Sequence, residues 1–185
     1  MFYNLNTRIP LEKYAEEIIP GTSPESKYYN EKENGLPFYQ GKKDFGKKYL
    51  KNPSIWTSVS IKKSIKNDIL MSVRAPVGDV NINPFSEICI GRGLCAIRCS
   101  SIGKQKYLFY WLLINKEKIN GHDGVTFDSI SVNEINELQI PSPSKDLQEE
   151  FASYVEEIDK LKFEANDRKN KAEIEKENLI EKYFR

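Results

Sequence analysis

The spacing of apolar residues in the last forty positions predicts a long helix that meets another helix. From Leu147 onward, apolar side chains recur at alternating intervals of four and three residues, as at the core positions of a coiled coil. A helix over residues 145–185 would be about 60 Å long at ~1.5 Å per residue, longer than a domain of residues 1–144 needs. We expect a spacer helix whose dimer interface consists of Leu147, Phe151, Tyr154, Ile158, Leu161, Ala165, Ala172 and Leu179.

The apolar repeat weakens after Ala165, where Arg168 and Glu175 occupy positions in phase with it. Polar residues at such positions usually select the register or the partner at some cost in stability. The alternative is a single amphipathic helix that folds back on its own domain.

Residues 1–144 have the pattern of an α+β domain. Pro10 can open a short helix whose apolar face extends to Ile19, and Gly21 ends it. Short apolar or alternating runs punctuated by Gly and Pro predict strands, and Ser131 with Glu134 forms a capping-box signature. The predicted elements after the first helix are strands at 36–40, 55–61, 68–73, 77–82 and 93–99, helices at 107–119 and 131–138, and an extended connector at 139–144.

Composition and charge favour a globular domain that contacts a polyanion. The sequence has nine Phe, ten Tyr and two Trp residues, enough apolar area for a core, and its net charge is only +1. That balance hides a cluster, because residues 42–66 contain eight Lys and a single acidic residue, Asp44. Such a patch suits nucleic acid. A solvated run that serves solubility is the alternative.

The remaining composition argues against several classes of protein. No apolar stretch approaches 18 residues, and residues 1–10 lack a signal-peptide core, so we expect a cytoplasmic protein without membrane spans. Cys89, Cys95 and Cys99 have neither a C-x-x-C spacing nor nearby histidines, so we interpret them as small buried residues rather than disulfide partners or zinc ligands. No nucleotide-binding loop and no nuclease-like carboxylate cluster is present, and we expect no cofactor, no metal and no catalytic residue.

Candidate DNA contacts come from loops that combine cationic, amide and hydroxyl groups. Residues 38–43 interleave aromatic, amide and cationic side chains, as loops that contact DNA grooves do. Gly91-Arg92-Gly93 lets backbone approach closely around a guanidinium that can bind a phosphate or a guanine edge, although a surface ion pair is an alternative. The candidate DNA-binding residues are Lys27, Tyr39, Gln40, Lys42, Lys43, Lys47, Lys48, Arg92, His122, Thr126 and Ser129.

Two of these loops also have simpler explanations. His122 is the only histidine, so Ser-His-Asp catalysis would require it, but a hydrogen-bonded loop residue explains it more simply. The turn from Arg74 to Gly78 sits between two predicted strands, where Pro76 fixes φ and Gly78 is permissive. We interpret this turn as structural in the first place, with DNA contact as the alternative.

Six segments, in order, resemble the target-recognition domain of type I restriction-modification specificity subunits. They cover almost the whole chain. The segments are Gly21-Thr22-Ser23-Pro24, residues 68–78 with Arg74-Ala75-Pro76-Val77-Gly78, Ile90-Gly91-Arg92-Gly93, residues 107–113, residues 124–130 with Gly124-Val125-Thr126-Phe127, and residues 138–143 followed by Gln148-Glu149.

The resemblance implies a non-catalytic subunit that recognises double-stranded DNA. Separate modification subunits of the family transfer a methyl group to adenine, and restriction subunits translocate and cut DNA, so these subunits are the implied partners. A full specificity subunit has two recognition domains and two spacer helices, whereas this chain has one of each. It therefore resembles a half subunit, which could form a homodimer, complete another half subunit, or be a truncated product.

Two other functions remain open from the residues. One is a protein-interaction adaptor that uses the coiled coil alone. The other is the recognition module of a fused restriction-modification enzyme, which would be a monomer. Binding to DNA with a steep salt dependence would exclude the adaptor.

Overall fold

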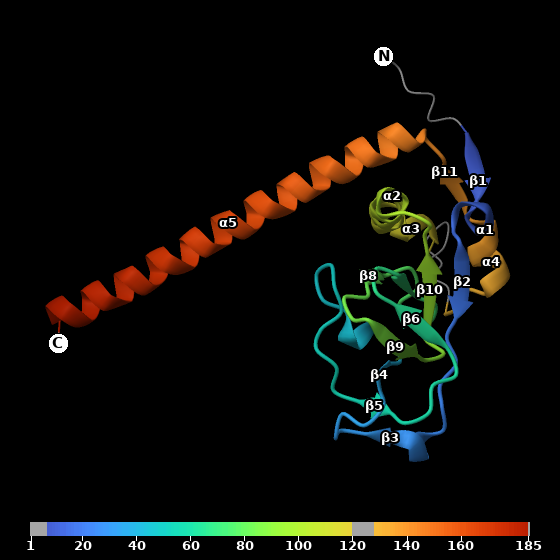
Figure 1. Ribbon diagram of the computed structural model, residues 1–185, viewed down its shortest axis with the longest axis horizontal. Coiled ribbons are helices and arrows are strands. Elements are labelled where there is room, and N and C mark those ends of the chain that lie inside the picture. The colour runs from blue at the N-terminus through green and yellow to red at the C-terminus, as the bar shows by residue number, and fades with distance from the viewer. Residues whose placement is uncertain (1–6, 120–127, 185) are drawn as a thin grey trace.

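Strands form three sheets in the described part of this protein, and one long helix ends it (Figure 1). These elements come from a computed structural model that describes residues 7–119 and 128–184. The smallest sheet pairs β1 (Arg8–Pro10) with β11 (Gln139–Pro141), so the connector predicted at 139–144 contains a strand. The mixture of sheets and helices, followed by the long C-terminal helix, confirms the predicted fold class.

The four-stranded sheet is antiparallel and buried on both faces. Its strands, in spatial order, are β2 (Glu17–Pro20), β10 (Leu94–Arg98), β7 (Ile69–Ser72) and β8 (Val80–Ile82). Ile69 and Met71 belong to the core on the helical side, whereas Leu70 belongs to the core shared with the next sheet. Since successive side chains of a strand point to opposite faces, the continuous apolar run at 69–71 reflects burial on both sides.

The five-stranded sheet brings the ends of two distant strands together. Its order is β3 (Tyr29–Asn30), β5 (Trp56–Thr57), β4 (Leu36–Tyr39), β9 (Glu87–Ile90) and β6 (Lys63–Ile65). β4 and β9 are parallel, and the Gly91 amide donates to the Tyr39 carbonyl oxygen at 2.8 Å. The residues that follow these two strands are therefore neighbours. Strands β6 and β9 were not predicted, and the strand predicted at 55–61 is reduced to β5.

The first predicted helix is shorter than its apolar face suggests. α1 (Leu11–Tyr14) ends at Ala15, whose backbone is extended. Residues 17–20 instead form β2, in which Ile18 and Ile19 lie opposite Ile97 and Ala96 of β10. The prediction of a helix through Ile19 is wrong, because pairing with a distant strand determines the conformation of this segment.

The remaining short helices contribute Leu108, Ile119 and Ile135 to the core on the helical side of the four-stranded sheet. α2 (Ile102–Ile114) begins before the predicted helix, with the Ser101 hydroxyl accepting from the Lys104 amide, and α3 (Lys116–Ile119) follows a break at Asn115. α4 (Val132–Glu137) has the predicted capping box, in which Ser131 and Glu134 each bind the other's backbone amide. No helix among the described residues is long and apolar enough to cross a membrane.

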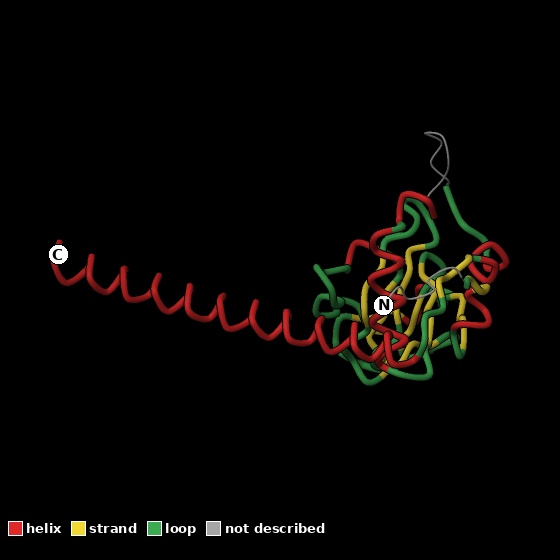
Figure 2. Tube along the Cα trace, turned by 90° about the horizontal axis from the view of Figure 1, so that it is seen from above, coloured by secondary structure: helices red, strands yellow, loops and turns green. Residues whose placement is uncertain are grey.

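Helix α5 (Lys145–Phe184) packs against the domain with its first turns only, and the rest extends away from it (Figures 1 and 2). Its buried residues are Gln148, Ala152 and Val155. The side-chain Nε2 of Gln148 donates to the Pro143 carbonyl oxygen at 2.8 Å, and the Tyr14 hydroxyl donates to Gln148 Oε1 at 3.2 Å. The base of α5 is thus part of the core, and the turns beyond it extend from the domain (Figure 1).

Candidate nucleic-acid interface

Two adjoining cavities, of about 270 and 700 Å³, form a cleft at the end of the five-stranded sheet. They share Gln40, Gly41, Lys42 and Ala75. We call this the cationic cleft, because none of the described residues that line it is acidic and five are basic. Its lining residues are Gln40, Gly41, Lys42, Lys43, Phe45, Lys51, Arg74, Ala75, Pro76, Arg92 and Gly93.

Glycines allow the segment around Arg92 to lie against the backbone of Gln40. A Cβ atom on Gly93 would be 2.4 Å from the Gln40 carbonyl oxygen, and one on Gly91 would be 3.1 Å from the Gln40 Cα atom. Neither backbone neighbour could move easily, so side chains at these positions would separate the two loops. The Arg92 amide also donates to Ser23 Oγ at 3.1 Å. The close approach inferred from Gly-Arg-Gly is therefore present.

The backbone around Arg74 is held from both sides. The Val73 amide donates to the Gly93 carbonyl oxygen at 3.0 Å, and the Ala75 amide donates to the Asp128 carbonyl oxygen at 2.9 Å. The Ser72 hydroxyl closes the following turn, which contains a cis Ala75–Pro76 peptide, by donating to the Pro76 carbonyl oxygen at 2.8 Å. These bonds support the structural interpretation of the turn.

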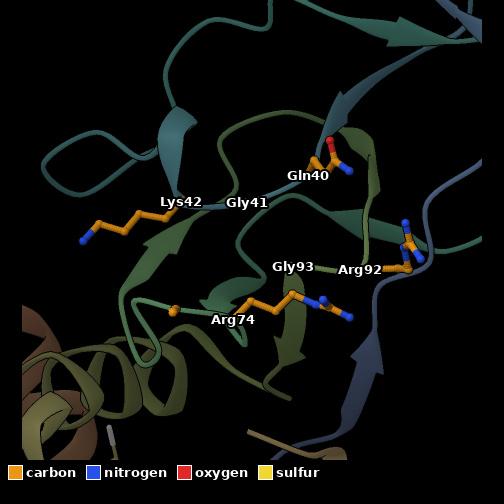
Figure 3. A pocket seen from close by; sticks show the side chains of 7 residues that line it. Gln40, Gly41, Lys42, Arg74, Arg92 and Gly93 are labelled. Carbon is orange, nitrogen blue, oxygen red and sulfur yellow. The ribbon is translucent and has the colours of Figure 1, made fainter. Parts of the chain in front are cut away.

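The same turn also places the Arg74 side chain among the predicted site residues. Figure 3 shows Arg74 extending toward the side where Arg92 lies, while Lys42 points in the opposite direction. Arg74 and Arg92 also line a further cavity of about 250 Å³ together with Ser129, which forms an isolated β-bridge with Arg74. The fold thus brings Gln40, Arg92 and Ser129 together around Arg74, a residue outside the predicted set.

The lysines of the cluster are not equivalent. Lys42 Nζ lies 2.6 Å from Asp79 Oδ2, and Lys116 Nζ lies 2.7 Å from Asp79 Oδ1. Burial alone would raise the pKa of Asp79, but the bonds from Lys116 and Lys42 hold that pKa below its usual value. Lys43 and Lys47 are exposed and form no ion pair with a described residue, although Lys43 lies within electrostatic reach of Asp44, so both can contact an external anion.

Three further candidates do not line the cleft. Lys27 is exposed at the 3₁₀ turn Ser26–Tyr28 and forms a 2.7 Å ion pair with Glu25. Tyr39 is only 1% exposed and its hydroxyl donates to the Lys51 carbonyl oxygen at 2.7 Å, so it is a core residue with no surface for DNA. Lys48 forms an ion pair with Asp159 of α5 and lies 5.6 Å from the centre of the Tyr110 ring, which assigns it to the helix junction.

Arg74 and Lys51 line the cleft but are absent from the candidate DNA-binding residues. Arg74 lies in a turn that its Pro and Gly residues explained as structural, and Lys51 was only one member of a charge run. His122 and Thr126 lie outside the described residues. Among the described residues no group of His, Cys, Asp and Glu could hold a metal ion.

The cysteines are packing residues in this fold. Cys89 and Cys95 are buried, as expected, whereas Cys99 is only partly buried. Burial raises the pKa of Cys95 to about 12 and that of Cys99 to about 12. Both thiols therefore stay protonated near neutral pH, where they are poor nucleophiles and poor metal ligands.

The predicted helix interface divides into two parts. Phe151 contacts the rings of Tyr107 and Tyr110 edge-on, with centroid distances of 5.8 and 5.7 Å, so it packs inside its own domain. Leu147 is partly buried, and Ala165 and Ala172 are exposed. Beyond Phe151 the large apolar residues of the predicted interface are exposed: Tyr154, Ile158, Leu161 and Leu179 have exposed fractions of 58%, 49%, 57% and 49%.

Solved structures with the same fold include chains of type I restriction-modification (R-M) systems. A chain from a study of complex assembly and conformational transition of the type I R-M system superposes with a TM-score of 0.75 and 34% identity, covering 94% of this chain and 43% of that one. The HsdS subunit from Thermoanaerobacter tengcongensis gives a TM-score of 0.71 and 34% identity over 84% of this chain and 37% of its own. The S subunit from M. genitalium, at 20% identity and a TM-score of 0.62, shares the fold.

Sequence comparisons agree with the structural ones. A protein of Methanocaldococcus jannaschii named as the specificity subunit of the type I restriction enzyme MjaX is 43% identical over 170 residues, which are 89% of this chain and 38% of that protein. This chain therefore spans less than half the length of these relatives. The model of the type I restriction modification DNA specificity domain matches residues 16–176. Because this match covers most of the sequence, the chain belongs to the type I restriction modification DNA specificity domain family.

Proposed function

We propose that this chain is the sequence-specific DNA recognition component of a type I restriction-modification complex in the cytoplasm. The observation that carries the proposal is the cationic cleft, where basic side chains from three distant loops meet without a carboxylate among the described lining residues. Lys and Arg bind backbone phosphates, and Gln can bind an adenine edge with two hydrogen bonds. The cleft therefore offers both affinity for DNA and a means of distinguishing bases.

Catalysis belongs, in this proposal, to partner subunits. The chain would direct methyltransferase subunits, and restriction subunits where they are present, to the sites that it binds. Helix α5 provides a surface for such assembly, since it extends well away from the DNA-binding domain (Figure 1).

The exposed stripe on α5 supports a homodimer of half subunits. Tyr154, Ile158 and Leu161 are spaced by four and three residues and each has about half of its surface exposed. Two copies that pair these stripes antiparallel would be related by a two-fold axis and would present their clefts in inverted orientation. The target would then be two half-sites in inverted repeat around a gap of fixed length.

Salt-dependent DNA binding tests the recognition function. Binding of a labelled duplex would be measured by fluorescence anisotropy across a NaCl series. The logarithm of the binding constant should fall linearly with the logarithm of the NaCl concentration, with a slope of about −0.9 per neutralised phosphate. Replacing Lys42 and Lys43 with Gln should weaken binding to all duplexes and flatten the slope by up to about two. The matched control replaces Lys160 and Lys162 of α5, which removes the same charge outside the cleft.

Two results would reject this function. A wild-type protein without salt-dependent DNA binding would favour the adaptor, for which the apolar stripe on α5 alone would suffice. Equal binding by the cleft variant and its control would show that the lysine cluster serves solubility or folding instead.

Methylation mapping tests the dimeric arrangement. Cells would carry this chain as the sole specificity subunit together with its modification subunit, and modified adenines would be located across the genome. A gapped palindrome is expected from a symmetric dimer. A non-palindromic or ungapped motif would exclude the homodimer of half subunits, and a monomer in solution would favour a module of a fused enzyme.

A further inference from the structure

Arg74 and Arg92 lack the internal partners that a structural arginine has in this fold. Arg98 provides the comparison: its Nε and Nη2 atoms donate to Asp68 at 3.0 Å each, and its Nη1 atom donates to Glu17 at 2.5 Å. No hydrogen bond or ion pair joins the guanidinium of Arg74 or Arg92 to any residue within 7–119 or 128–184. Within the described residues, two cationic groups are thus left without a compensating partner at one place.

The side chains of Arg74 and Arg92 line the same two cavities. Both line the smaller part of the cationic cleft and the cavity that reaches Ser129. The described residues around both cavities include no Asp or Glu. Figure 3 shows the Arg74 side chain directed to the side of the cleft where Arg92 lies.

Their backbones are fixed relative to each other. Val73 donates to Gly93 across the cleft, and Arg74 forms a β-bridge with Ser129. The Arg92 amide is bound by Ser23. Because both backbones are fixed, only the two side chains must be ordered around a ligand.

We propose that Arg74 and Arg92 form a fork that binds a single phosphate of the DNA backbone. The inference rests on the proposed function and assigns this part of the cleft to a phosphodiester rather than to a base. Two neighbouring cations repel each other unless an anion lies between them, and a base edge offers only neutral acceptors. A guanidinium donates two parallel hydrogen bonds to a phosphate, so the fork can satisfy both non-bridging oxygens.

The fork gives the interface a sequence-independent anchor. A phosphate contact fixes the register of the protein on the duplex without distinguishing bases. Gln40, which is exposed just after β4 and lines the same cavity, then remains available for a base edge.

The test uses Arg74→Gln, Arg92→Gln, the double variant and Lys13→Gln in the full chain. Lys13 is exposed on α1 and lines neither cavity, so its replacement controls for the loss of one charge. Binding to a random-sequence duplex would be followed by anisotropy across a NaCl series, with circular dichroism melts to verify folding. Each cleft variant should bind about tenfold more weakly, since it loses a charge-assisted bidentate contact.

The double variant identifies a shared ligand. If both arginines bind one phosphate, the double variant should flatten the salt slope by about 0.9, whereas two separate phosphates would give about 1.8. Its loss of affinity should also be smaller than the product of the single losses, because the two changes remove the same contact. Arg74→Lys should keep the slope but recover affinity only in part, since an ammonium cannot form the bidentate contact.

Selection of bound duplexes from a random library distinguishes phosphate from base contact. The variants should enrich the same motif as the wild-type protein. A changed base preference, an unchanged salt slope or a slope change near 1.8 would overturn the fork while leaving the proposed function intact. Failure of the wild-type protein to bind any duplex would instead remove the proposed function, and the fork with it.

Discussion

Phe151→Ala tests whether the base of α5 belongs to the domain or to the surface between two helices. Sequence periodicity assigns Phe151 to a seam that faces a partner helix, whereas the structure packs its ring against Tyr107 and Tyr110 of α2. The two arrangements predict different consequences. In the packed arrangement the substitution loosens α5 from its own domain, and a dimer formed by later turns of the helix survives.

The expected cost follows from the contacts of the ring. Phe151 is partly buried, and exposing about 100 Å² of its apolar surface costs about 2.5 kcal/mol at ~25 cal/mol per Å². Edge-to-face ring pairs each add about 0.5–1.5 kcal/mol, and truncation of fully buried Phe costs about 3–5 kcal/mol. We expect about 3 kcal/mol for Phe151→Ala, or roughly a hundredfold increase in the undocked population.

Hydrogen exchange measured by mass spectrometry locates the effect. Amides within 145–155 should lose about two orders of magnitude of protection, and urea unfolding should show the stability loss, because Gln148 and Tyr14 couple the helix to the core. Phe163→Ala is the matched control, since Phe163 is 76% exposed on the same helix. It should change stability by less than about 0.5 kcal/mol.

One pattern of results would refute this reasoning. If Phe151→Ala dissociated a dimer while residues 145–155 kept their protection, Phe151 would belong to the intermolecular seam and the packing on α2 would not exist in solution.

Two further predictions concern single side chains. Ile158→Asp should convert a dimer into monomers, because a carboxylate within the apolar seam costs several kcal/mol unless the helices separate; light scattering that shows an intact dimer would contradict the seam. Burial would raise the pKa of Asp79, but the bonds from Lys116 and Lys42 outweigh it and lower that pKa. The Asp79 carboxylate therefore stabilises the fold at pH values above the unfolded-state pKa, near 3.8. This stabilisation is lost as the pH falls through the lower pKa of the folded state. Urea unfolding of Asp79→Asn should therefore show about 1 kcal/mol less stability at pH 7 and a weaker loss in acid than the wild-type protein, and parallel pH profiles would exclude this role.

Local patterns in the sequence were sufficient for features that depend on neighbouring residues. The spacing of apolar residues predicted a helix from residue 145 onward, and the structure has α5 over Lys145–Phe184. Ser131 and Glu134 predicted a helix start, because the capping box involves residues three positions apart. The two glycines beside Arg92 predicted a close backbone approach, although not which backbone approaches.

Distant pairing decided the features that the sequence left open or predicted wrongly. Residues 17–20 have a helical apolar face, yet they form a strand because β10 offers backbone partners and buries Ile19. Tyr39 is excluded from the cleft for a similar reason. The parallel pairing of β4 with β9 directs it into the core and leaves the next residue, Gln40, exposed.

The cationic cleft itself is a product of the tertiary structure. Amino-acid sequence alone determined the family resemblance, the long helix and the excess of lysine in residues 42–66. Only the folded chain determined which charges are available: Lys48 is bound by Asp159, Lys42 is shared with Asp79, and Arg74 lines a cavity with Arg92 and has no ion pair to any residue that the structure describes. A periodic pattern reports on a helix or strand because its contacts are local, whereas the pairing of charges depends on strands and loops that are far apart in sequence and meet only in the folded domain.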